Sequence, residues 1–161
     1  MKIRTLATLA ALLAASACVA APADGGDRLQ SISFETGPCF GACPVYRVRV
    51  DASGRGEFEG RRFTAAEGSH AFTVTPAQWR AFTQRLAPYR PNGDETIGPA
   101  HARCQMQATD HPSATVTWND AAGTDRLAFY FGCHDAENRA LARALEEAPT
   151  LLPIAALIRR N

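Results

Sequence analysis

The chain has 161 residues, a length that suits one domain, and its 17 basic side chains are balanced by 16 acidic ones. This near-zero net charge argues against binding to nucleic acid, which requires a basic patch or stripe on the protein surface. No apolar run reaches the roughly 20 residues that a membrane-spanning helix needs, so we expect no transmembrane helix.

The first residues have the three-part plan of a secretory signal peptide. Lys2 and Arg4 precede an apolar run, and small residues follow it. Residues 15–18, ASAC, resemble a bacterial lipobox with Ala15 in place of the usual Leu. This resemblance implies lipidation of Cys18 and attachment to the membrane through it.

Ordinary cleavage after 15–17 (ASA) or 21–23 (APA) is the alternative. Either way we expect an exported protein of the bacterial periplasm, lipid-anchored or, in the alternative, soluble or secreted. The expected organisation is a signal peptide and tether over 1–23, a linker over 24–31 and a single domain over 32–161.

Several segments before residue 75 predict strands. Residues 31–35 and 45–51 alternate apolar and polar side chains, the period of half-buried strands, and in the second Tyr46, Val48 and Val50 share one side. ASGRG turns the chain, and a strand around Phe58 completes a hairpin. Residues 71–74 predict a short further strand, and His70 reads as a loop residue.

A helix is predicted to begin after Thr75. Gln78 stands three residues later and Pro76 between them, which is the pattern of a capping box followed by proline at the first helical position. Trp79, Phe82 and Leu86 recur at helical spacing and predict a core-facing stripe.

The second half of the chain starts with a long polar stretch, 88–112, which we interpret as a loop. We expect removal of residues 92–100 to leave the fold intact but to abolish capture of a partner. Residues 114–118 and 127–131 predict paired strands, Asp135 is a candidate cap for a second helix, and 150–160 predicts a short terminal helix. Hairpins with segregated helices indicate an α+β fold, an antiparallel sheet packed against two or three helices.

Four cysteines remain once Cys18 is lipidated or removed. An even number in an exported chain predicts two disulfides, and four cysteines allow three pairings. We favour Cys39–Cys43 with Cys104–Cys133, because the second bridge would tie the long loop to the end of a predicted strand.

Residues 39–60, CFGACPVYRVRVDASGRGEFEG, and 108–118, ATDHPSATVTW, carry a resemblance to a known family. They resemble the bacterial family catalogued as domain of unknown function 6438, with CFGACPVY as the most specific part. The resemblance runs from about Ile32 to Ile158. It implies one exported domain and assigns neither a reaction nor catalytic residues.

Metal binding through the cysteines is an alternative. Cys39-x3-Cys43 followed by Pro44 also resembles the copper motif of Sco-type proteins, and thiolates suit Cu(I). In those proteins the motif opens a helix, whereas here a β-patterned segment follows it. His101 and His134 lie near Cys104 and Cys133, so a Cys2His2 site for zinc or copper is a second arrangement.

The sequence supports catalytic functions less well than binding. Dithiol redox chemistry favours Cys-x-x-Cys at a helix N-terminus, which is absent here. Asp110, His111 and Ser113 could be assembled into a hydrolase triad on paper, but their adjacency is more typical of a turn.

The expected function is therefore a binding or structural module of the cell envelope, more consistent with a non-enzymatic role than with catalysis. Its partner would be an envelope protein or a small ligand, with the 88–112 stretch as the candidate binding region and no resident cofactor. The alternative is a copper- or zinc-binding thiol protein.

Overall fold

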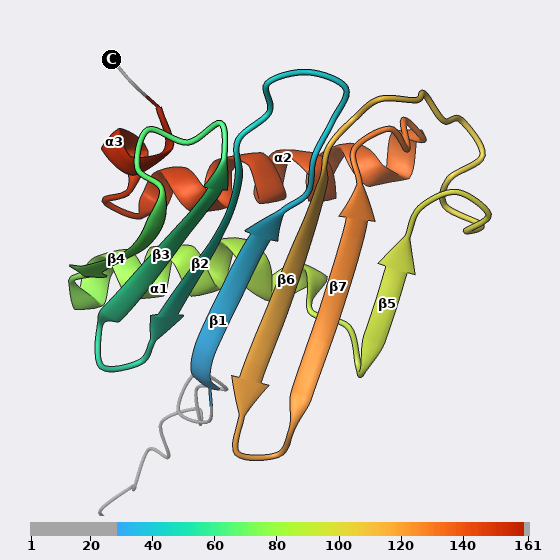
Figure 1. Ribbon diagram of the computed structural model, residues 1–161. Coiled ribbons are helices and arrows are strands. Elements are labelled where there is room, and N and C mark those ends of the chain that lie inside the picture. The colour runs from blue at the N-terminus through green and yellow to red at the C-terminus, as the bar shows by residue number, and fades with distance from the viewer. Residues whose placement is uncertain (1–28, 160–161) are drawn as a thin grey trace, which may run out of the picture.

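A seven-stranded sheet with the order β4-β3-β2-β1-β6-β7-β5 dominates the computed structural model, which describes residues 29–159 (Figure 1). Neighbouring strands pair antiparallel except β5 and β7, which are parallel. The predicted signal peptide, the lipobox-like residues 15–18 and with them Cys18 lie outside the described residues. The strands are β1 Leu29–Thr36, β2 Val45–Asp51, β3 Arg55–Arg62, β4 Gly68–Thr73, β5 Asp94–Ile97, β6 Ser113–Asp120 and β7 Thr124–Tyr130.

Helices cover one face of this sheet and leave the other open (Figure 1). The helices are α1 Pro76–Leu86, α2 Arg139–Glu147 and the short α3 Ala155–Ile158, with 3-10 turns at Ala87–Tyr89, Ala136–Asn138 and Ala148–Leu151. This arrangement confirms the α+β class, the mainly antiparallel sheet and the stabilisation by two disulfides. Within the described part of the chain, no helix is long and apolar enough to cross a membrane.

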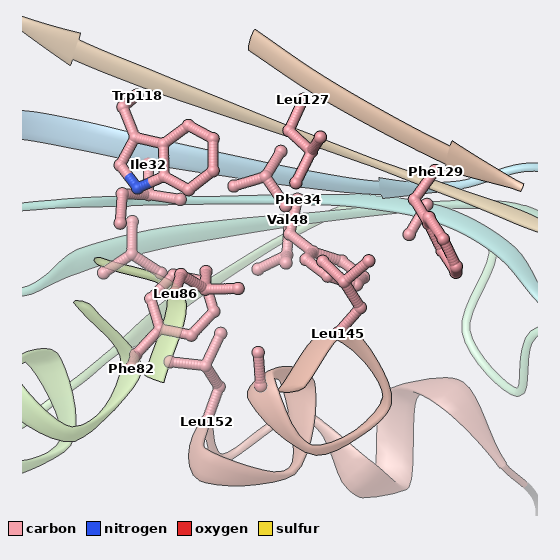
Figure 2. Packing of buried hydrophobic residues seen from close by; sticks show 14 of the residues in the cluster. Ile32, Phe34, Val48, Phe82, Leu86, Trp118, Leu127, Phe129, Leu145 and Leu152 are labelled. Carbon is pink, nitrogen blue, oxygen red and sulfur yellow. The ribbon is translucent and has the colours of Figure 1, made fainter. Parts of the chain in front are cut away.

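The core lies between the sheet and the two longer helices (Figure 2). Because side chains alternate along a strand, every second residue of β1, β2 and β6 faces the helices, as Phe34, Val48 and Trp118 do. Phe82 and Leu86 meet them from α1 and are fully buried. Trp79 packs against the same cluster while remaining partly exposed, so the predicted helical stripe faces the core.

The capping box predicted at the start of α1 is present. The hydroxyl of Thr75 accepts a hydrogen bond from the Gln78 backbone N–H at 3.2 Å, and Gln78 Oε1 accepts from the Thr75 N–H at 2.9 Å. Such a cap stabilises a helix by about 1 kcal/mol. Pro76 occupies the first helical turn, where its missing N–H costs nothing.

The interpretation of 88–112 as one long loop is wrong, because residues 94–97 form β5. The strand pairs in parallel with β7, and Ile97 is fully buried. Removal of residues 92–100 would therefore delete a strand of the sheet with its buried Ile97, so the expectation that it leaves the fold intact is wrong. The strand was missed because only one of its four residues is apolar, and its partner lies about thirty residues further along the chain.

Three smaller expectations also need correction. β1 begins at Leu29, inside the predicted linker, and His70 lies in β4 rather than in a loop. The Asp135 carboxylate does not cap the helical turn that follows it, because it accepts a hydrogen bond from the Met106 N–H at 3.1 Å. A contact between segments far apart in sequence replaced the local one.

The base of the sheet, where β2 turns into β3 and β6 into β7, is held by carboxylates. Arg90 pairs with Asp120 at 2.7 Å and with Asp125 at 2.5 Å. The Arg90 hydrogen bond lowers the pKa of Asp120, and the Gly93 N–H lowers that of Asp125, with Arg90 contributing further. These contacts tie the chain ahead of β5 to the β6–β7 hairpin.

Candidate binding site at the loop end

The opposite end of the sheet collects most of the longer connections. Segments 37–44, 98–112 and 131–135 follow or precede strands that all end there, and α2 and α3 lie beside them (Figure 1). We call this the loop end. It contains both disulfides and His101, His111 and His134.

The Cys39–Cys43 disulfide closes a short loop with a Cα–Cα distance of 5.8 Å. Gly41 has φ +135°, a backbone conformation that side chains disfavour. The loop is anchored by the Phe40 N–H, which donates to the Asp110 carbonyl at 3.2 Å. The Phe40 side chain is left 87% exposed, so the crosslink presents an aromatic ring to solvent.

The strand entrance beside this loop is also hydrogen bonded. The Thr36 hydroxyl donates to the Pro44 carbonyl at 2.8 Å and accepts from the Tyr46 N–H at 3.0 Å. Tyr46 stacks on Phe58 with 5.4 Å between ring centroids. Burial raises the pKa of the Tyr46 phenol, with a smaller opposing effect from Arg159, so the phenol keeps its proton and can donate a hydrogen bond.

The second disulfide joins Cys104 to Cys133 with a Cα–Cα distance of 4.8 Å, and both residues are 3% exposed. It is the pairing favoured from the sequence. The His134 N–H donates to the Met106 carbonyl at 2.7 Å, and the Asn138 amide donates to the Arg103 carbonyl at 2.6 Å. The segment after β5 is thus pinned to the end of β7 and is not a free loop.

A pocket of about 610 Å³ opens between the Cys39–Cys43 loop, the ends of β1 and β2, and the helices α2 and α3. Its lining is mostly apolar and comes from segments spread over the whole domain. The apolar lining includes Phe34, Pro112, Phe131, Leu145, Pro149 and Ile158.

Polar groups line part of the same pocket. Glu146 and Arg159 are exposed and carry opposite charges, while Thr36, Ser113 and Thr150 supply hydroxyls. An apolar cavity with a few polar groups is the common form of a small-molecule site. The arrangement can hold an apolar body inside and solvate a polar end outside.

The four cysteines proposed as alternative metal ligands are oxidised in this structure. Metal-binding sulfur is a thiolate, and disulfide sulfur is not. Within residues 29–159, no group of three or more His, Cys, Asp or Glu side chains is placed to hold a metal ion. The donor set therefore does not fit a copper or zinc site in this state.

The histidines make other contacts. His101 Nδ1 accepts a hydrogen bond from the Arg103 N–H at 3.2 Å, and the His134 ring lies edge-on to that of His111 at 5.1 Å. Asp110 has φ 71°, and its carboxylate accepts from Thr109. In the described residues no hydrogen bond joins the side chains of Asp110, His111 and Ser113; Asp110 lies in a bend, and Ser113 is the first residue of β6.

The comparison with protein families agrees with this architecture. The family model described as domain of unknown function (DUF6438) matches residues 30–151, which is more than half of the chain. The chain belongs to the DUF6438 family. No curated protein and no solved structure matches it.

In this DUF6438 domain the residues of the resemblance lie next to the pocket. Cys43, Pro44 and Tyr46 of CFGACPVY line it directly. The contributions of α2 and α3 were not foreseen, because Leu145 and Ile158 have the same pattern as ordinary core residues. Only the three-dimensional structure joins them to the cysteine loop.

Proposed function

We propose that this DUF6438 protein is an exported binding module of the bacterial cell envelope that takes a ligand in the apolar pocket at the loop end. The observation that carries the proposal is the pocket itself, whose volume of about 610 Å³ lies within the usual range for small-molecule sites. Its role is to bind and not to catalyse.

The ligand we propose is a small amphipathic molecule with an apolar body and one anionic end. Phe34, Phe131 and Leu145 favour an apolar body, because they offer carbon surface with few hydrogen-bonding partners. Arg159 favours the anionic end, since its exposed guanidinium is a strong partner for a carboxylate. The crosslink at Cys43 limits movement of one wall and so lowers the entropic cost of binding.

Export and anchoring are part of the same proposal. The signal-peptide pattern at the N-terminus supports export, and disulfides persist in oxidising compartments such as the periplasm. Lipidation of Cys18 would leave a short Gly- and Asp-containing tether before β1. The domain would then lie close to the membrane surface, where amphipathic molecules are abundant.

The matched substitutions Ala155→Trp and Ala156→Trp test the pocket. Both alanines are exposed neighbours in α3, but only Ala155 lines the pocket. With decanoate as the probe and calorimetry as the measurement, we expect the wild-type protein and Ala156→Trp to bind alike. Ala155→Trp should weaken binding by about tenfold or more, which corresponds to about 1.4 kcal/mol.

Two outcomes would contradict the proposal. One is absence of saturable decanoate binding by the wild-type protein. The other is equal binding by Ala155→Trp, because an indole at this position would stand in the mouth of the pocket. Thermal unfolding of both variants checks that the fold survives.

A further inference from the structure

The open face of the sheet carries a second hollow, of about 550 Å³, on the side away from the helices. Its floor is formed by short polar side chains on the two central strands, Ser31 and Ser33 of β1 and Thr115 and Thr117 of β6. The serines are 1% and 7% exposed although no helix covers them, because longer side chains on the neighbouring strands rise around them.

Three arginines form the walls of this hollow. Strand register places Arg49 beside Ser33, Ser33 beside Thr117, and Thr117 beside Arg126. Arg49 and Arg126 therefore lie on either side of the hydroxyl pair. The backbones of their strands, β2 and β7, are three strand spacings apart, which is about 14 Å. Arg47 is two residues from Arg49 on the same face and lengthens the basic wall.

The strand register places Glu57 opposite Arg49, Glu59 opposite Arg47 and Asp94 opposite Arg126, but none of these carboxylates lies within ion-pair distance of the arginine that it faces. Glu35 and Glu59 pair with Arg61 at 3.0 and 3.2 Å, and Asp51 pairs with Arg55 at 2.9 Å. Within residues 29–159, none of Arg47, Arg49 and Arg126 has a carboxylate oxygen within ion-pair distance. The lining holds these three arginines against one acid, Glu35, and that acid already has a partner.

Hydrogen bonds hold some of the side chains that line the hollow in place. The Arg49 guanidinium donates to the Ser31 hydroxyl at 3.1 Å, which holds its side chain toward the floor. Asn119 donates to the same hydroxyl at 3.5 Å. No hydrogen bond within residues 29–159 occupies the hydroxyls of Ser33, Thr115 or Thr117, so they are available to a ligand.

We infer that this hollow binds an acidic sugar, a ligand with one carboxylate or phosphate group and several hydroxyls. Guanidinium groups recognise both oxyanions through paired N–H donors. The hydroxyls of the floor, with the side-chain amides of Gln30 and Asn119 in the lining, match the alternating donors and acceptors of a sugar ring. The site is separate from the apolar pocket, since Arg47, Arg49 and Arg126 face away from the core that the pocket adjoins.

Two arginine substitutions and one matched control test the inference. Arg49→Gln and Arg126→Gln each remove one wall, whereas Arg143→Gln changes an exposed arginine of α2 on the helical side. The probes are glucuronate, glucose 6-phosphate and, as the neutral comparison, glucose. Binding is measured in two ways: by NMR, through the side-chain N–H signals of the arginines, and by calorimetry.

We expect saturable binding of at least one acidic probe, with Kd in about the millimolar range or tighter. Loss of one charge-assisted hydrogen bond should weaken it about tenfold in Arg49→Gln and in Arg126→Gln and leave Arg143→Gln unchanged. Tighter binding of glucose 6-phosphate assigns the anion as phosphate, and tighter binding of glucuronate assigns it as carboxylate.

The inference is overturned if neither acidic probe saturates the signals of Arg49 and Arg126, or if glucose binds as well as the acids. An equal loss in Arg143→Gln would also overturn it, because a distant positive charge would then explain the effect. Decanoate binding provides an independent control, since it reports on the apolar pocket and should be unchanged in all three variants.

Discussion

The two disulfides differ in the length of chain that they close, so their removal should destabilise the protein unequally. We consider the paired substitutions Cys39→Ala/Cys43→Ala and Cys104→Ala/Cys133→Ala. Cys18→Ala in every sample leaves no other cysteine to exchange with them.

The expected magnitudes follow from the closed loops. The first disulfide joins residues separated by 4 positions and the second by 29. In the chain-entropy treatment these bridges stabilise by about 2 and about 3.6 kcal/mol respectively. Packing widens the difference, because Cys104 and Cys133 are 3% exposed whereas Cys39 and Cys43 are only half-buried. Against a typical free energy of unfolding of about 5–15 kcal/mol, loss of the longer bridge is severe.

Urea denaturation of the oxidised proteins measures both losses. Trp118 is 1% exposed in the core, so its fluorescence reports on global unfolding. We expect Cys104→Ala/Cys133→Ala to cost at least about 1.5 kcal/mol more than Cys39→Ala/Cys43→Ala. Equal losses, or a larger loss from the short loop, would refute the reasoning that closed-loop length and burial determine the contribution of each bridge.

Two further predictions concern ionisation and the N-terminus. Hydrogen bonds, first from the Ser53 hydroxyl and then from Arg55, lower the pKa of Asp51 to about 2. Because an unfolded aspartate titrates near about 3.9, this stabilisation is complete above that pH and is lost as the pH falls toward 2. NMR should give a carboxyl midpoint near pH 2, and Asp51→Asn should flatten the pH dependence of unfolding there; a midpoint near pH 4 would be inconsistent with the turn geometry. Intact mass of the protein exported by its own signal tests the anchor: we expect acyl chains on Cys18, and an unmodified chain starting at residue 18 or 24 would contradict lipidation.

Short sequence patterns predicted the elements that are held by hydrogen bonds between residues close together in the chain. The Thr75–Gln78 capping box marks the start of α1 because both of its hydrogen bonds lie within one turn. The β2–β3 hairpin was visible for the same reason, since Asp51 and Gly54 close its turn within a few residues. The alternation of residues 45–51 correctly separated buried from exposed positions.

Features that depend on distant partners could not be predicted from the sequence. β5 has one buried residue, Ile97, and is a strand because β7 offers it backbone partners. Asp135 bonds to Met106 across 29 positions and so loses its expected role as a cap.

The candidate site also has one part that the sequence could indicate and another part that depends on distant residues. The cysteine loop could be recognised from CFGACPVY, but the pocket beside it is completed by Phe131, Leu145 and Ile158. No spacing in the sequence connects those residues. The sequence placed the candidate binding region at 88–112 instead, and of that stretch only Pro112 lines the pocket.

The strand β5 also has a consequence for the behaviour of the protein at high concentration. A net charge of +1 provides little repulsion between copies, so charge alone is a weak barrier to self-association. The segment LAFYF would be hazardous if exposed at a sheet edge, because an apolar edge strand is a template for sideways addition of another chain. β5 covers that edge with a four-residue strand that carries Asp94 and Glu95. The short acidic strand therefore limits the addition of another chain at this edge of the sheet.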